Sequence, residues 1–555
     1  MAALSPVDRG TGPRSGEGVV VTPLSYGGST GPAGIAARAA PPPARGRNSE
    51  VAVLAAVPSA TLLGVQGHAV RVEVHVSSGL PGFTVVGLPD VSCRESRDRV
   101  RAAVLTSGFK WNLDRVTVNL APTNLRKVGS GLDLAIAVAL LAASEQLDAA
   151  LLDGLAFLGE LGLDGAVRHV VGTLPLCEAV GRHRPVVPLD DLREATLVRS
   201  DALGASDLAQ LVRSLRGEEP WPVDPPTRRA AGLPAHEPDL SQVQGHAVAR
   251  RALEVAAAGG HHLLMVGPPG AGKTMLAERL PGLLPDLDDE AALDVSRVHS
   301  AAGALHDRPE LLRRPPFRSP HHTASLVALV GGGSSVLRPG EISLASGGVL
   351  FLDELGEFPA AHLDALRQPL ESGEIRVARA AVGATLPARF LLVAATNPCP
   401  CGAGVVGRCR CSPGQVARYL RRLSGPLLDR FDLGLWVQPP DAAEVFGAGP
   451  PGESSARVRD RVASARDRAR SRGVPVNRRL SGEALERAAP LTDAGLHVLR
   501  ERIDRGSLTM RGAQRVRAVA LTLMDLDGRS GPIGPADLQV ALMLRSQDDV
   551  LGVAA

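Results

Sequence analysis

The fold of this chain is decided by one stretch, Leu263-Leu264-Met265-Val266-Gly267-Pro268-Pro269-Gly270-Ala271-Gly272-Lys273-Thr274. An apolar strand, a glycine-rich turn and a helix start follow one another here, which is the full Walker A pattern in its required context. Glycines let backbone N–H groups face a phosphate at the helix N-terminus. The pattern predicts an ATP site in which Lys273 spans the β- and γ-phosphates and Thr274 ligates Mg²⁺.

Two apolar runs farther along the chain end in polar side chains suited to ATP hydrolysis. The first run, residues 348–352, is followed directly by Asp353 and Glu354. We expect Asp353 to hold Mg²⁺ through water and Glu354 to polarise the attacking water. Residues 391–396 form the next predicted strand and end at Asn397, which is expected to orient that water.

Arginines near the end of this module are candidates for transition-state contacts. Arg430, within residues 424–432, is predicted to be an arginine finger that reaches the γ-phosphate of a neighbouring subunit. The alternative is a surface arginine paired with Asp429 or Asp432. Arg511 opens a predicted helix over 510–526 and is the expected second sensor, ahead of Arg515 one turn later.

The 555 residues predict two or three domains. Residues 1–50 are rich in Gly, Pro, Ser and Ala and are expected to be a disordered leader, either a functional arm or the product of a start codon placed too early. A mixed α/β domain is predicted over 51–215, with strands at 69–76 and 83–86 and helices at 92–106 and 132–143. A proline-rich linker (216–239), an ATPase core (240–440) and a helical domain (456–550) follow, the last with helices at 457–472, 481–489, 493–505, 510–526 and 535–544.

Composition narrows the class of protein. The net charge of +3 does not select a partner, and no apolar run reaches the roughly 18 residues that span a bilayer. The N-terminus lacks the pattern of a secretory signal, and six cysteines in so long a chain do not make a disulfide framework. We therefore expect a soluble cytoplasmic protein with no membrane contact.

Several longer strings resemble one family, the magnesium-chelatase-like AAA+ ATPases typified by the YifB and competence ComM proteins. The resemblance runs from Val53 to Leu544. Its strings are residues 78–90 (Ser-Gly-Leu-Pro-Gly-Phe-Thr-Val-Val-Gly-Leu-Pro-Asp), 94–101, 118–122, 317–323 (Phe-Arg-Ser-Pro-His-His-Thr), 339–345 and 397–402.

The resemblance implies an α/β fold with three parts: an N-terminal α+β domain like that of Lon proteases and ribosomal protein S5 domain 2, a P-loop AAA+ core, and a C-terminal helical lid. It also implies a homo-hexameric ring that uses ATP and Mg²⁺ to translocate on single-stranded or branched DNA, in recombination or natural transformation. A Lon-like active site needs a serine nucleophile and a lysine. Gly131 stands at the nucleophile's place here, so the N-terminal domain is expected to bind protein partners or position the ring.

Four cysteines form a candidate metal site. Cys399 and Cys401 make one C-x-C pair and Cys409 and Cys411 make another, close behind Asn397. Four thiolates on one loop could bind structural Zn²⁺, although C-x-x-C spacing is the usual pattern. Reduced cysteines or a redox-sensitive pair are the alternatives. The adjacent His321 and His322 are expected to belong to a structural or nucleotide-sensing loop rather than a metal site.

Residues 374–389 alternate in polarity around Gly383 and predict a β-hairpin before the sensor strand. Such a hairpin points into the pore of related ring helicases, where Arg376 and Arg379 would grip the DNA backbone. The alternative is that both are solvated charges on an edge strand.

Two other functions stay open at this stage. The chain could be the motor of a magnesium chelatase, although the Lon-like domain and the cysteine cluster are unusual for such motors. It could also be a remodeller that threads client proteins, although the hairpin offers arginines and has no aromatic residue before Phe390.

Overall fold

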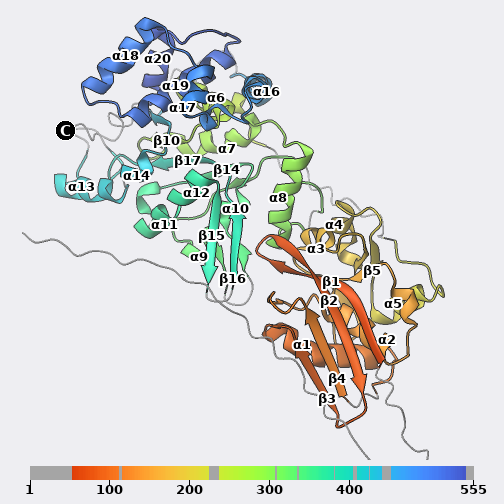
Figure 1. Ribbon diagram of the computed structural model, residues 1–555. Coiled ribbons are helices and arrows are strands. Elements are labelled where there is room, and N and C mark those ends of the chain that lie inside the picture. The colour runs from red at the N-terminus through yellow and green to blue at the C-terminus, as the bar shows by residue number, and fades with distance from the viewer. Residues whose placement is uncertain are drawn as a thin grey trace, which may run out of the picture. The chain divides into compact units, whose positions relative to one another are not determined.

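The computed structural model describes residues 53–545 except 112–114, 224–236, 307–308, 334–336, 380–381, 404–408, 424 and 441–451. The predicted leader and most of the predicted linker lie outside these residues. The described elements make up an N-terminal α/β domain, a core built on a parallel sheet, and a C-terminal helical domain (Figure 1). In the part of the chain covered by these ranges, no helix is both long and apolar enough to cross a membrane.

The N-terminal domain is built on a four-stranded sheet in the order β1-β2-β4-β3. The β1–β2 and β2–β4 pairs are antiparallel, whereas β3 and β4 are parallel. Helix α2 is apolar after Asp133 and is buried along its whole length, so it serves as the centre of this domain's core. The elements are β1 (Val53–Leu63), β2 (Gln66–Ser77), β3 (Gly82–Val86), α1 (Val91–Thr106), β4 (Arg115–Ala121) and α2 (Asp133–Ala143).

The same domain contains a smaller parallel sheet in the order β5-β8-β9 and a short hairpin of β6 and β7. Its helix α3 packs against α8 (Asp289–Ala301) of the core, where the Leu174 N–H donates to Ser300 Oγ at 3.3 Å. The elements are β5 (Leu155–Phe157), β6 (Glu160–Leu161), β7 (Val167–Arg168), α3 (Thr173–Ala179), β8 (Arg184–Pro188), α4 (Leu192–Thr196), β9 (Leu203–Ala205) and α5 (Leu208–Leu215).

The core carries a five-stranded parallel sheet in the order β11-β14-β17-β10-β18. Strands β10, β14 and β17 are buried throughout and are apolar except for Thr396 at the end of β17, as expected for parallel strands covered on both faces. Because the strands are parallel, all their carboxyl ends meet at one edge. The main elements are α6 (Ala247–Gly259), β10 (Leu263–Val266), α7 (Lys273–Leu283), α8 (Asp289–Ala301), β11 (Phe317–Arg318), β14 (Val349–Leu352), β17 (Leu391–Thr396) and β18 (Leu433–Trp436).

The predicted hairpin is confirmed: β15 (Glu374–Arg379) and β16 (Val382–Pro387) pair antiparallel. Gly331 and Gly332 pair with Pro339 and Arg338 in a two-residue ladder. The remaining core elements are α9 (Leu326–Val330), β12 (Gly331–Gly332), β13 (Arg338–Pro339), α10 (Glu341–Leu344), α11 (Ala360–Ala365), α12 (Arg367–Ser372), α13 (Pro413–Arg422) and α14 (Gly425–Leu428).

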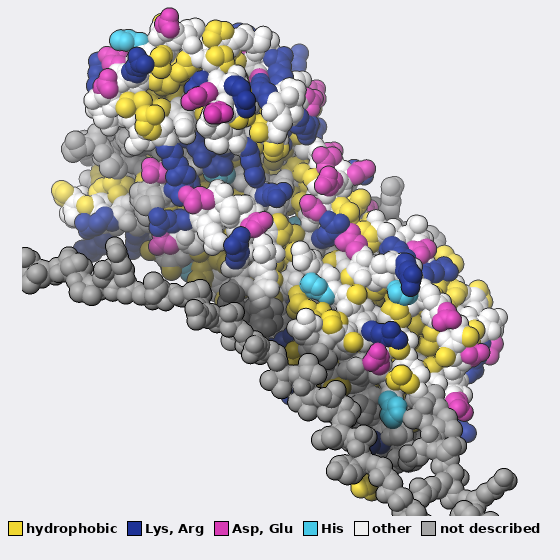
Figure 2. Space-filling model, viewed as in Figure 1, with side chains coloured by type: hydrophobic (Ala, Val, Ile, Leu, Met, Phe, Trp, Pro, Cys, Tyr) yellow, Lys and Arg dark blue, Asp and Glu magenta, His cyan; other side chains and the backbone are white. Residues whose placement is uncertain are grey.

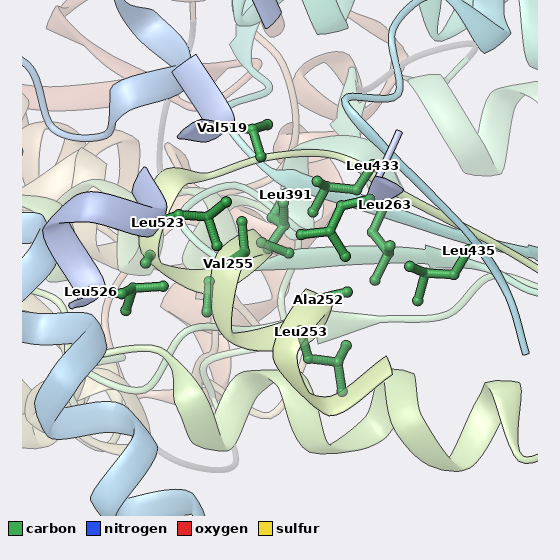
Figure 3. Close-up of a cluster of buried hydrophobic side chains, with 14 of the residues drawn as sticks. Ala252, Leu253, Val255, Leu263, Leu391, Leu433, Leu435, Val519, Leu523 and Leu526 are labelled. Atoms are coloured by element: carbon green, nitrogen blue, oxygen red, sulfur yellow. The ribbon is translucent and has the colours of Figure 1, made fainter. Parts of the chain in front are cut away.

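The C-terminal domain consists of α16 (Ser455–Ser471), α17 (Gly482–Ala488), α18 (Asp493–Asp504), α19 (Met510–Leu526) and α20 (Pro535–Met543). These helices confirm the five predicted ones, with ends that differ by a residue or two. Helix α19 packs on α6, and Val519 and Leu523 share one apolar cluster with Val255 and Leu263 (Figure 3). The helical domain therefore rests on the same core that supports the P-loop strand.

The N-terminal sheet is larger than the sequence pattern suggested. The predicted strand at 69–76 is the middle of β2, and the prediction named neither β1 nor β4. β1 contains Pro58 and several alanines, which weaken a strand signal. It is held instead by its continuous register with β2, from Val53 opposite Val76 to Leu63 opposite Gln66.

Candidate functional site

The glycine-rich loop joins β10 to α7 at the carboxyl edge of the core sheet. At Gly267 a Cβ atom would lie 2.1 Å from the carbonyl oxygen of Val437, so only glycine fits beside β18. Gly272 has a φ of 81° and directly precedes α7, which begins at Lys273. The first-turn N–H groups of a helix have no acceptor within it, so this loop presents donors and a positive dipole end to an anion.

Lys273 lies across the loop. Its Nζ donates to the carbonyl oxygens of Gly267 at 2.7 Å and Pro268 at 3.0 Å, and to Asn397 Oδ1 at 3.2 Å. Burial lowers the pKa of Lys273, while the charges of Asp353 and Glu354 oppose that shift. An ammonium in this position can transfer its hydrogen bonds from the loop carbonyls to phosphate oxygens.

An acidic pair follows β14 and faces the loop. Thr274 Oγ1 donates to Asp353 Oδ2 at 2.6 Å. The two side chains predicted to hold Mg²⁺ are therefore in direct contact. Hydroxyl and carboxylate oxygens are the ligand types that Mg²⁺ prefers, and it keeps several waters. The donor set therefore fits a magnesium ion held between Thr274 and Asp353.

Glu354 follows with a φ of 52°, and its N–H donates to Asp353 Oδ1 at 2.9 Å. The Glu354 carboxylate is more than half exposed and lies 3.3 Å from His322 Nδ1. The sequence placed His322 in a structural or nucleotide-sensing loop but did not predict its contact with Glu354.

These residues line one cleft of about 430 Å³, bounded by residues 269–275, Asp353, Glu354, Thr396 and Asn397. Asn397 follows β17, which lies between β10 and β14 in the sheet. Its side chain therefore sits between the loop lysine and the acidic pair. The cleft thus brings together Lys273, Thr274, Asp353, Glu354 and Asn397.

Arg430 and Arg511 lie elsewhere. Arg430 contacts the carboxylate of Glu371, and Arg511 lies 3.7 Å from the same carboxylate. Neither residue lines the cleft. Arg430 comes three residues before β18 begins, at the amino edge of the parallel sheet, whereas the loop follows β10 at the carboxyl edge. The paired arginines are thus separate from the phosphate site of their own chain.

More positive charge surrounds this pair. Arg389 precedes β17 at the same edge of the sheet. The pKa of Arg479 is lowered mainly by burial and, in addition, by the positive charge of Arg389. Figure 2 shows Lys and Arg side chains gathered on the viewed face where the C-terminal helices meet the core. Such a surface attracts phosphates.

Arg515, the less favoured second sensor, is held by Asp432 at 3.2 Å. Arg478 also donates to Asp432, at 2.7 Å, and the His262 N–H donates to it at 3.1 Å. Burial alone would raise the pKa of Asp432, but Arg478 and Arg515 hold that pKa well below its ordinary value. Asp432, which the sequence offered only as a partner for Arg430, instead ties β18 to the C-terminal helices.

The four cysteines of the two C-x-C pairs come together. The Sγ atoms of Cys399, Cys401 and Cys409 are 3.4–3.6 Å apart, and all four lie within 4.8 Å of one another. A tetrahedral Zn–S₄ site with bonds of about 2.3 Å separates its sulfurs by about 3.8 Å. Hydrogen bonds from the Ala403 and Arg410 backbone lower the pKa of Cys401 to about 6, whereas burial raises the pKa of Cys411 to about 12, so the geometry of the four sulfurs carries the argument for a metal. The donor set fits structural zinc. The four sulfur atoms come together although the cysteines have C-x-C rather than C-x-x-C spacing.

The hairpin carries Arg376 on an exposed strand position opposite Thr385, while Ile375 and Leu386 are buried. The side chain of Arg379 lies outside those described. Along β16, Gly64 of the β1–β2 turn approaches Ala384 and Leu386. The N-terminal domain therefore contacts the candidate DNA-binding element.

Comparison with known proteins agrees with this architecture. Residues 72–190 match the family "Subunit ChlI of Mg-chelatase", 239–445 match "Magnesium chelatase, subunit ChlI", and 452–545 match "Magnesium chelatase, subunit ChlI C-terminal". YifB of Escherichia coli is 45% identical over 90% of this chain and 98% of its own. Competence protein ComM of Haemophilus influenzae is 44% identical over 86% and 94%, respectively. A shorter match, 27% identical over 32% of this chain and 22% of the relative, is to "Probable DNA helicase MCM9" of Arabidopsis thaliana.

Proposed function

The chain belongs to the YifB/ComM family of magnesium-chelatase-like AAA ATPases, and from that premise we propose that it is an ATP-hydrolysing ring motor that translocates along DNA. The observation that carries the ATPase part is the cleft that gathers Lys273, Thr274, Asp353, Glu354 and Asn397. Competence protein ComM and, more distantly, an MCM9 helicase favour DNA as the track.

The proposed hydrolysis assigns one task to each residue of the cleft. The loop N–H groups and Lys273 bind the β- and γ-phosphates, and Thr274 and Asp353 hold the Mg²⁺ that neutralises phosphate charge. Glu354 accepts a proton from the attacking water once its carboxylate leaves His322, and Asn397 orients that water. Lys273 already donates to Asn397 Oδ1, so the water-orienting amide and the phosphate-binding ammonium are held in one network.

The proposed ring is supported by the distance between the acids of the cleft and the arginine pair, which lie at opposite edges of the core sheet. Arg430 and Arg511 share Glu371 at the amino edge of the sheet, so they cannot serve the cleft at the carboxyl edge without large movement. A head-to-tail contact between two copies would bring that arginine pair to the neighbour's γ-phosphate. Release from Glu371 would accompany ATP binding at the subunit interface.

The proposed DNA contact is the β15–β16 hairpin. Arg376 is exposed on β15, and its buried neighbour Ile375 anchors the strand to the core. Exposed arginine on a rigid hairpin gives salt-dependent binding without sequence preference. Arg379 is proposed as the second contact of the same strand.

A second function is favoured by one finding: all three matched families are described by the chelatase subunit ChlI. Under this alternative the same ATP cycle drives metal insertion with partner subunits. The two candidates differ in what stimulates ATP turnover.

The test is the ATPase rate of the full chain with and without single-stranded and four-way-junction DNA, over a range of salt. Lys273→Ala sets the blank. We expect DNA to stimulate turnover, and Arg376→Ala to weaken stimulation and lower the salt slope by about one. Arg500→Ala, an exposed arginine on α18, is the matched control and should behave like the wild type. A rate that ignores DNA at every salt concentration would refute the translocase and favour the chelatase motor.

A further inference from the structure

A second cluster of metal-binding side chains lies apart from the ATP cleft and the cysteines. His169 follows β7 and Asp191 precedes α4 in the N-terminal domain, while His306 comes shortly after α8 of the core. One ligand atom from each lies within 4.8 Å of the other two. We propose that these three residues bind a divalent transition metal ion of the Zn²⁺ class, which links the N-terminal domain to the ATPase core.

The geometry converges on one carboxylate oxygen. Nδ1 of His306 lies 3.5 Å from Asp191 Oδ1, and Nδ1 of His169 contacts the same oxygen. The two imidazole rings are 4.0 Å apart between centroids. Zinc bonds of about 2.0–2.2 Å in a tetrahedral site place ligand atoms about 3.3–3.6 Å apart. The separation of His306 and Asp191 already matches this spacing, whereas His169 Nδ1 has to withdraw from Asp191 Oδ1 by about an ångström to leave room for the ion.

Two hydrogen bonds fix the orientation of the Asp191 carboxylate. Its side chain is fully buried, and its other oxygen accepts from the Val170 N–H at 3.0 Å and Thr173 Oγ1 at 3.1 Å. These bonds leave Oδ1 directed at the two histidines. Hydrogen bonds of this kind orient ligand carboxylates in metal sites.

The surroundings favour a cation. Asp190 adjoins Asp191, and buried Glu194 lies on the next helix, where it accepts from the Leu174 N–H at 3.0 Å. His169 also lines a cavity of about 470 Å³, which has room for water in the remaining coordination positions. Two imidazoles and one carboxylate are the donor set of open zinc sites, and they differ in kind from the four thiolates of the cysteine loop.

The position gives the ion a structural consequence. The surrounding interface already contains the Arg297–Glu178 ion pair at 2.7 Å and the Leu174–Ser300 hydrogen bond. A metal that ligates His306 on one side and His169 with Asp191 on the other would fasten α8 to the N-terminal domain. Its loss would loosen that junction without touching the ATP cleft.

The test counts metal in the full chain. After incubation with zinc and removal of the free ion, we expect the wild type to retain about one equivalent more than His306→Ala. His183→Ala is the matched control, because His183 bonds to the Val180 carbonyl within its own turn, and it should retain the wild-type content. Circular dichroism checks that each variant folds, and His169→Gln is the second variant if His306→Ala does not.

Cobalt distinguishes this site from the cysteines. A Co²⁺ ion on nitrogen and oxygen ligands gives weak visible bands, whereas thiolate ligands add an intense charge-transfer band in the near ultraviolet. We expect His306→Ala to lose the former and keep the latter. Equal zinc content in the wild type and a folded variant, together with an unchanged cobalt spectrum, would overturn the proposal and leave Asp191 as a hydrogen-bonded structural carboxylate.

Discussion

Asp432→Asn should destabilise the junction between β18 and the C-terminal helices. The Asp432 side chain is fully buried, and its carboxylate faces Arg478 at 2.7 Å and Arg515 at 3.2 Å. Asparagine keeps the shape but removes the charge, which leaves two largely buried guanidinium groups, 14% and 19% exposed, without a counterion.

The size of the effect follows from that geometry. Unit charges about 4 Å apart interact by about 4 kcal/mol at an effective dielectric constant of about 20, and desolvation offsets part of this. Removing one partner of a buried pair costs about 3–5 kcal/mol, and the residual exposure of both arginines favours the low end. A loss of about 3 kcal/mol lowers the melting temperature of a domain of about 150–250 residues, such as the ATPase core, by about 6–12 °C.

The pH dependence is also specified. Arg478 and Arg515 hold the pKa of Asp432 well below its ordinary value against the effect of burial, so the carboxylate is ionised throughout pH 5–8. The ionised Asp432 carboxylate contributes fully to the free energy of unfolding above the pKa that it has in the unfolded chain. This contribution is lost as pH falls from that value through its pKa in the folded protein. The difference between wild type and Asp432→Asn should therefore stay constant from pH 8 to pH 7. At lower pH the variant should also lose the support that the Asp432 charge gives to protonation of the neighbouring His261, so the difference should not shrink.

Thermal denaturation of the full chain measures this, with Asp460→Asn on the exposed face of α16 as the control. Combining Asp432→Asn with Arg478→Met removes one of the uncompensated charges, so the double variant should be more stable than the sum of the single effects predicts. A shift below about 1 °C for Asp432→Asn, or strict additivity in the double variant, would refute the reasoning.

Three further predictions concern other parts of the chain. Glu354→Gln should keep nucleotide binding, measured by fluorescence, while ATP turnover falls about 10²–10⁴-fold, and retained turnover would remove Glu354 from the role of base. Cys409→Ser should lose about one zinc equivalent by elemental analysis, and an unchanged zinc content would exclude a cysteine site. Burial lowers the pKa of both His261 and His262, so the unfolded state takes up protons first as pH falls below about 6.5. Stability measured by thermal melts should therefore fall from pH 7 to pH 5, by up to about 1.4 kcal/mol per pH unit for each histidine, and a flat profile would contradict this.

The features that the sequence can predict are those whose residues are contiguous in the chain. Residues 263–274 contain the strand, turn and helix of the phosphate loop, and a cluster of four cysteines occupies residues 399–411, so local pattern sufficed to propose both. The contact between His322 and Glu354 was not predicted, because it joins two loops whose approach depends on the order of β11 and β14 in the sheet.

Distance along the chain explains the other omissions. Asp432 pairs with Arg478 and Arg515, which lie on helices of another domain. The sequence could offer only the nearest arginine, Arg430, which contacts Glu371 in the structure. His169 and His306 belong to different domains, and no periodicity links them. Single histidines in a sequence carry no signal until the fold brings their nitrogen atoms to one carboxylate.

The parallel sheet itself leads from one chain to an assembly. Parallel strands put every carboxyl end at one edge, where the phosphate loop and the acids Asp353 and Glu354 lie, and every amino end at the other, where Arg430 and Arg389 lie. Within one chain the proposed phosphate contacts of the second edge cannot reach the nucleotide at the first. Under the proposed function, a second copy in the same orientation along the sheet would supply them, and its own cleft would then need a third. Such a heterologous contact either closes as a ring or continues as a filament, so strand direction and the position of the arginines support the proposed head-to-tail assembly.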